Sequence, residues 1–115
     1  MMRRVRQERP AFPPDVAQAL QRPAGRVTVR YTLPAAYARP RAHDVMLMRT
    51  PYERVLVALT LDTKGSLRFV RTGSREEGAR VALCPVGPEL LRPHAHWDIA
   101  LAWDADELTV EVRER

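Results

Sequence analysis

The sequence predicts a mainly β protein, an antiparallel β-sandwich of about seven strands with a short N-terminal helical turn and a Pro/Arg-rich arm. Two observations predict this class. From residue 26 onward, apolar and polar residues alternate with a period of two, which is the period of a half-buried strand. The alternating segments are also short and separated by turn residues, as in sandwiches and barrels. A chain of 115 residues is long enough for one domain with its own core.

We expect two parts, a basic arm over residues 1–25 and a sandwich over residues 26–115. The prolines among residues 10–14 prevent a regular helix or a central strand there. A short helix is predicted over residues 15–21. Phe12 is the one large apolar side chain of residues 1–14, and it is expected either to anchor the arm on a partner or to cover an edge of its own domain.

Seven strands are expected, over residues 26–33, 44–49, 54–61, 67–70, 79–84, 97–103 and 108–112. The segment 54–61 is apolar on both faces, which is typical of a central strand covered twice. A hairpin turn with Gly65 at its end follows this segment. In segment 79–84, Val81 and Leu83 share one face, and Cys84 is expected on the polar or second face.

The pairing of the first and last strands is predicted from their charges. The first strand carries Arg26 and Arg30 on its outward face, and the last carries Glu107 and Glu111. Opposite charges on neighbouring strands are favourable, so these two strands are expected to lie side by side.

Positive charge is concentrated near the N-terminus. The formal net charge is +5, and residues 1–43 hold nine arginines against two acidic residues. A GC-rich genome would account for the arginines, but the asymmetry also fits an arm that contacts a partner or nucleic acid. The candidate partner-binding residues are Phe12, Arg3, Arg4, Arg6 and Arg9. The nucleic-acid alternative adds Arg26, Arg30, Tyr37, Arg39 and Arg41, with Tyr37 as the exposed aromatic group for base stacking.

The hairpin over residues 96–112 resembles those of concanavalin/laminin-G-like sandwiches. It begins with His96-Trp97, continues as Ile99-Ala100-Leu101 and returns through Leu108-Thr109-Val110. The resemblance implies a jelly-roll-like sandwich that binds sugar or protein, and it transfers no site residues. Trp97 and Trp103 could stack on a sugar ring, although their alternation favours a place in the core.

One segment has the composition of a metal site. His94, His96 and Asp98 are two residues apart, so in an extended strand they would share a face and offer two imidazoles and a carboxylate. Polar residues at the solvated start of a strand are the alternative. The single cysteine, Cys84, has no neighbouring base, which favours a structural role.

No catalytic motif is present, so we lean towards a non-enzymatic protein without a cofactor. The lone cysteine and the lack of an apolar stretch after the basic start fit a cytoplasmic protein with no membrane partner. The favoured function is a small binding or assembly module that acts through protein–protein contacts in an oligomer or larger complex. The alternatives are polyanion or nucleic-acid binding through the arm, and a carbohydrate-binding or metal-binding sandwich.

Overall fold

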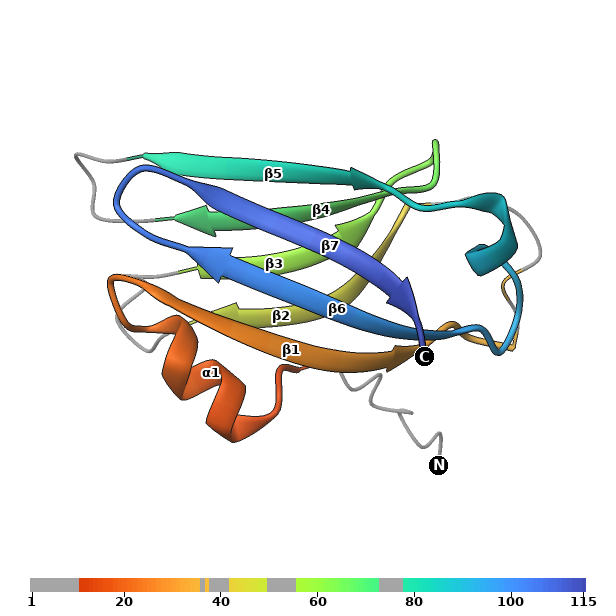
Figure 1. Cartoon of the computed structure of the whole chain (residues 1–115), viewed down its shortest axis with the longest axis horizontal. Helices are drawn as coiled ribbons and strands as arrows, with labels where there is room; N and C mark the ends of the chain where they lie inside the picture. The colour runs from red at the N-terminus through yellow and green to blue at the C-terminus, as the bar shows by residue number, and fades with distance from the viewer. Residues whose placement is uncertain (1–10, 36, 38–41, 50–55, 73–77) are drawn as a thin grey trace, which may run out of the picture.

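The fold is an antiparallel β-sandwich, as the sequence predicts. The structure is a computed structural model that describes residues 11–35, 37, 42–49, 56–72 and 78–115. One sheet has three strands in the order β1-β6-β7, and the other has four in the order β2-β3-β4-β5 (Figure 1). The elements are α1 (Pro14–Leu20), β1 (Gly25–Thr32), β2 (His43–Arg49), β3 (Leu56–Leu61), β4 (Ser66–Thr72), β5 (Ala79–Pro85), the 3-10 turn η1 (Pro88–Leu90), β6 (His96–Trp103) and β7 (Leu108–Glu114).

The predicted pairing of the first and last strands is wrong. β1 pairs with β6, and β6 lies between β1 and β7. The reason is burial, because every inward side chain of β6 is in the core, from Trp97 at 0% exposed to Trp103 at 3%. The strand with the largest apolar inward face takes the middle of the sheet, where flanking strands cover it on both sides. Charge matching between β1 and β7 is too weak to override this.

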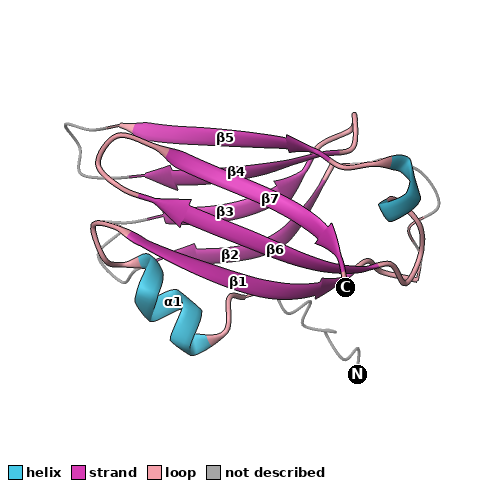
Figure 2. Cartoon of the chain, viewed as in Figure 1, coloured by secondary structure: helices cyan, strands magenta, loops and turns pink. Residues whose placement is uncertain are grey.

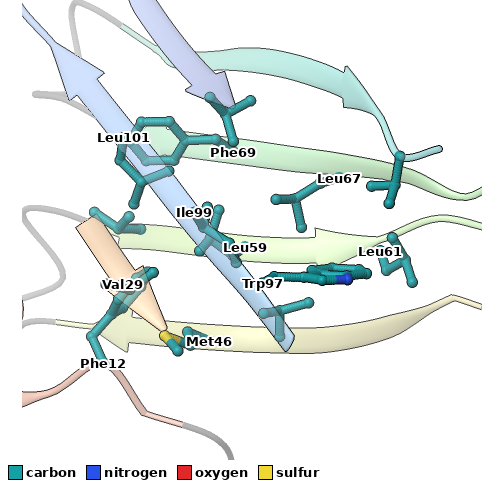
Figure 3. Close-up of a cluster of buried hydrophobic side chains, with 14 of the residues drawn as sticks. Phe12, Val29, Met46, Leu59, Leu61, Leu67, Phe69, Trp97, Ile99 and Leu101 are labelled. Atoms are coloured by element: carbon teal, nitrogen blue, oxygen red, sulfur yellow. The ribbon is translucent and has the colours of Figure 1, made fainter. Parts of the chain in front are cut away.

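The core lies between the two sheets and includes side chains from all seven strands or their flanks (Figure 3). Leu59, Leu67 and Phe69 from the four-stranded sheet face Ile99 and Leu101 from the three-stranded sheet. The buried ring of Trp97 donates its Nε1–H to the Leu90 carbonyl at 2.9 Å, which satisfies its one polar group. Both tryptophans are therefore core residues, as their alternation indicates.

The segment before β1 covers one side of the sandwich. Figure 2 shows α1 alongside β1, at the side where β1 and β2 are the outermost strands. Phe12, Val16 and Leu20 belong to the same buried cluster as the strands. The Phe12 amide also donates to the Leu47 carbonyl at 3.4 Å, next to an isolated parallel bridge between Ala11 and Leu47. Phe12 is only 5% exposed, so it covers an edge of its own domain, the second of the two roles expected for it.

The carbonyl of Arg22 joins α1 to both sheets. It accepts a hydrogen bond from Arg71 Nη2 at 2.8 Å and another from Trp103 Nε1 at 2.9 Å. Arg71 comes from β4 and Trp103 from β6, and the Arg71 guanidinium also lies 5.9 Å from the centre of the Trp103 ring. Arg71 is 7% exposed and donates at 3.4 Å to the carbonyl of Leu20, the last residue of α1. A cation at a helix C-terminus is favourable, so Arg71 fixes the end of α1 against the sandwich.

The β3–β4 turn is fixed by Asp62 and Gly65. The Asp62 carboxylate accepts hydrogen bonds from the amides of Lys64 at 2.8 Å and Ser66 at 2.9 Å. These bonds lower the pKa of Asp62 below its ordinary value, and the bond from the Ser66 amide contributes most to this shift. Gly65 has a φ of 79°, which explains the glycine predicted at this position.

We predict that Phe12→Ala lowers the free energy of unfolding by about 3 kcal/mol, because it removes a buried ring and leaves a cavity. Urea denaturation followed by circular dichroism measures the change. Pro13→Ala, at an exposed neighbouring position, is the control and should change stability much less. A loss below about 1 kcal/mol in Phe12→Ala would show that residues 11–13 do not hold the core closed.

We also predict that Asp62 contributes to an acid-dependent loss of stability. Its pKa is lower in the folded state than in the unfolded state, so its contribution is present above the unfolded pKa and is lost as pH falls through the folded pKa. Melting temperatures measured between about pH 6 and pH 2 should therefore depend less on pH in Asp62→Asn than in the wild type. Thr63→Ala, in the same turn, should keep the wild-type dependence. Parallel curves for Asp62→Asn and the wild type would contradict this role.

Candidate protein-binding surface

Six apolar side chains lie on the outer side of the four-stranded sheet, and we call them the outer apolar face. They are Leu47, Leu56, Ala58, Val70, Val81 and Leu83. The strand register places one of them on each strand in a continuous row, because Leu47 pairs with Ala58, Ala58 with Val70, and Val70 with Val81. None belongs to the buried cluster or to the residues packed against it.

The most exposed part of this face is on β5. Val81 is 47% exposed and Leu83 is 61% exposed, and they are the two large hydrophobic side chains in the exposed class among the described residues. β5 is also an edge strand, hydrogen-bonded to β4 alone within the described part of the chain. An edge strand with exposed apolar side chains promotes association, and natural proteins normally place charges there.

The period of β5 agrees with the prediction, but the face expected to be the polar or second one, which carries Cys84, is the face that packs against the core. Ala82 and Cys84 pack against the core, so Val81 and Leu83 point to solvent. Cys84 is half-buried, and its Sγ lies 3.6 Å from the Pro85 carbonyl, which agrees with a structural role. The apolar outward side of the segment 54–61 is the sequence feature from which this face could have been predicted. That segment is central, as predicted, but no described residue covers its second face.

A polar row flanks the apolar row. Asp44 on β2 pairs with Thr60 on β3, which pairs with Arg68 on β4. These three residues line a shallow depression of about 340 Å³ together with Asp62. The face therefore carries opposite charges towards its two sides, with Arg68 towards β5 and Asp44 on β2.

The outer side of the three-stranded sheet is different in character. It forms a groove of about 450 Å³ floored by Ala100 and Ala102, where small side chains of β6 lie between longer ones of β1 and β7. Here the structure brings together Arg26, Arg30, His96 and Asp98, all candidates from the sequence. Asp98 lies between Arg30 and Arg113 in the strand register. Acidic and basic groups alternate, so this face does not carry the continuous positive charge that a nucleic-acid backbone favours.

Tyr37 does not have the exposure expected of a stacking residue. It is 1% exposed, and its amide donates to the Pro34 carbonyl at 3.0 Å, which turns the chain back towards the domain. Its ring lies 5.9 Å from that of His43. Burial of a large ring stabilises the loop more than exposure would, and this effect decided its position. Arg39 and Arg41 lie outside the described residues, as do Arg3, Arg4, Arg6 and Arg9.

The three candidate metal ligands do not form a site. His94 is exposed in a turn with a φ of 64°, before β6 begins. His96 is exposed at the start of β6, with its Nδ1 at 3.0 Å from Thr32 Oγ1. Asp98 follows on the same outer face. No group of three or more histidine, cysteine, aspartate or glutamate side chains suited to a metal occurs in the described part of the chain.

Comparison with known proteins gives no further assignment. No family model, curated protein or solved structure matches the chain. The resemblance to concanavalin/laminin-G-like proteins therefore extends only to a sandwich-like arrangement of two antiparallel sheets. Neither described helix is long and apolar enough to cross a membrane.

Proposed function

We propose that the protein is a small assembly module that pairs with a second copy of itself through the outer apolar face. The observation that supports this is the apolar row from Leu47 to Val81, which is partly exposed at Leu47, Ala58 and Val70 and exposed at Val81, and which the exposed side chain of Leu83 extends. Removing apolar surface from water contributes about 25 cal/mol per Å². A contiguous patch of this kind on a small domain is characteristic of a protein–protein contact.

The pattern of the face favours a second copy as the occupant. A two-fold axis parallel to the strands, between β3 and β4, would place Val81 of one copy over Leu47 of the other. The same operation would bring Arg68 over the Thr60 position of the partner copy, one strand away from Asp44. In the row from Leu47 to Val81, apolar groups would then meet apolar groups, while Leu83 would lie over the Asp44 position of the partner copy. The positive side of one face would approach the negative side of the other.

The size of the face indicates a weak contact. Strands of about six residues are about 20 Å long, and four strands span about 19 Å. Two such faces would bury about 800 Å² in total, which is below the roughly 1,200 Å² of stable complexes. We therefore expect a weak, concentration-dependent dimer with a dissociation constant between about 10 µM and 1 mM.

A protein partner is favoured over the other ligand classes. The family resemblance implied sugar or protein, but Trp97 and Trp103 are buried and offer no ring for sugar stacking. The polyanion alternative depends mainly on arginines outside the described residues. Arg26 and Arg30, the described members of that set, share their face with Asp98 and Glu111.

Sedimentation equilibrium between about 10 µM and 1 mM tests the proposal. The average mass of the wild type should rise with concentration towards twice the monomer mass. Val81→Lys, which places a charge over Leu47 of the partner copy, should lower the association constant at least tenfold, whereas Leu83→Lys, which places a cation over the Asp44 position, should lower it much less. Both positions are exposed, so the melting temperatures of the variants should remain close to that of the wild type.

Thr109→Lys is the matched control, because it adds the same charge on β7, on the outer side of the other sheet. It should leave the association constant unchanged. A wild type that stays monomeric up to about 1 mM would overturn self-association. Association that Thr109→Lys weakens as strongly as Val81→Lys would move the contact away from the outer apolar face.

A further inference from the structure

A second candidate site lies at the end of the sandwich where β4 leads into its loop and β5 begins. A cavity of about 470 Å³ opens there, lined by Gln21, Pro23, Arg71, Arg80 and Ala105. These residues come from the α1–β1 connection, from β4 and β5, and from the β6–β7 turn. The volume is within the range of small-molecule sites.

Arg80 is the residue that points to a ligand. It is directed inward, on the same side of β5 as Ala82 and Cys84, and its Nη2 donates to the Asp104 carbonyl at 2.7 Å. Its Nη1 is buried and has no hydrogen-bond partner among the described residues. Among the described residues Arg80 forms no ion pair, although its charge helps to lower the pKa of the Asp104 carboxyl. A buried guanidinium nitrogen without an acceptor is costly, so an acceptor supplied by a ligand would be stabilising.

The neighbouring cation strengthens this inference. Arg71 and Arg80 are directly opposite each other in the β4–β5 register, and both line the cavity. An anion in the cavity would meet guanidinium donors, whose planar geometry suits carboxylate and phosphate oxygens.

We propose that this cavity binds a small oxyanion, the phosphate or carboxylate group of a small molecule, with Arg80 as its principal ligand. Arg71 adds positive charge from the opposite strand, while its Nη2 remains bonded to the end of the α1 segment. The site is independent of the outer apolar face, because Arg80 points inward and its neighbour Val81 points outward.

The test is a titration of the full chain with sodium phosphate, followed by two-dimensional ¹H–¹⁵N NMR at constant ionic strength. The Trp103 indole N–H is bonded to Arg22, beside the cavity, and serves as the reporter. The Trp97 indole N–H, bonded to Leu90 towards the other end of β6, is the internal control. We expect a saturable shift at Trp103 with no shift at Trp97. A parallel titration with sodium acetate distinguishes a phosphate site from a general oxyanion site.

Arg80→Gln should weaken phosphate binding at least tenfold, whereas Arg68→Gln, which removes an exposed arginine from the outer side of β4, should not change it. If Arg80→Gln does not fold, Arg80→Lys keeps the charge without the planar fork, and it should bind phosphate more weakly than the wild type. No saturable shift in the wild type with either anion would overturn the proposal.

The chain's own acidic residues provide a further test of the proposal. The sequence between β4 and β5 contains Glu76 and Glu77, and we test them together as Glu76→Gln/Glu77→Gln. Phosphate binding that appears only in this double variant would mean that an internal carboxylate occupies the cavity, and this result would overturn a ligand site. Equal binding in the double variant and the wild type supports the proposal.

Discussion

The Arg22 carbonyl is the point on which the arrangement of the two sheets and the helix depends. It accepts one hydrogen bond from each sheet, through Arg71 and Trp103, at the place where the chain leaves α1 and enters β1. β1 and β2 are not paired with each other in the described chain, so without α1 the core would be open along that side. The two bonds hold α1 where Leu20 can be fully buried. A buried arginine is expensive unless its donors are satisfied, and backbone carbonyls at a helix end satisfy them well.

The two outer faces of the sandwich differ because the strands of the two sheets carry different residues on their outward positions. On the three-stranded sheet these positions hold alanines at the centre and charged or hydroxyl side chains on both sides. That face is well solvated and needs no cover. On the four-stranded sheet the outward row is apolar across all four strands, from Leu47 to Val81. Antiparallel sheets usually show one buried and one polar face, so this second sheet departs from the pattern on a side that no described residue covers.

Local patterns in the sequence were sufficient to predict the strands but not to predict which strands pair. Alternation predicted the strands and the β6–β7 hairpin, because a period of two is a property of the segment itself. The order of the strands depends on which inward face is largest, and that comparison involves residues far apart in the chain. The same limit explains why the burial of Phe12 and Tyr37 and the orientation of β5 could not be predicted from local patterns. Whether Val81 or Cys84 faces the core is decided by the opposite sheet and by the bond from Arg80 to the Asp104 turn, and neither is visible in the segment 79–84.

β4 and β5 carry both proposed sites, and their alternation keeps the sites apart. Val70 pairs with Val81 and points outward, while the next pair, Arg71 with Arg80, points inward. A partner on the outer apolar face would contact the first pair and leave the second facing the cavity. The side chains are therefore independent, but the backbone is shared, since a strand that is pinned on one face also fixes the direction of the side chains on the other. For the same reason, a partner that stiffens the exposed edge strand would reduce the conformational freedom that Arg80 loses when an anion binds. Any coupling between assembly and anion binding would then pass through the order of β5 and not through a direct contact.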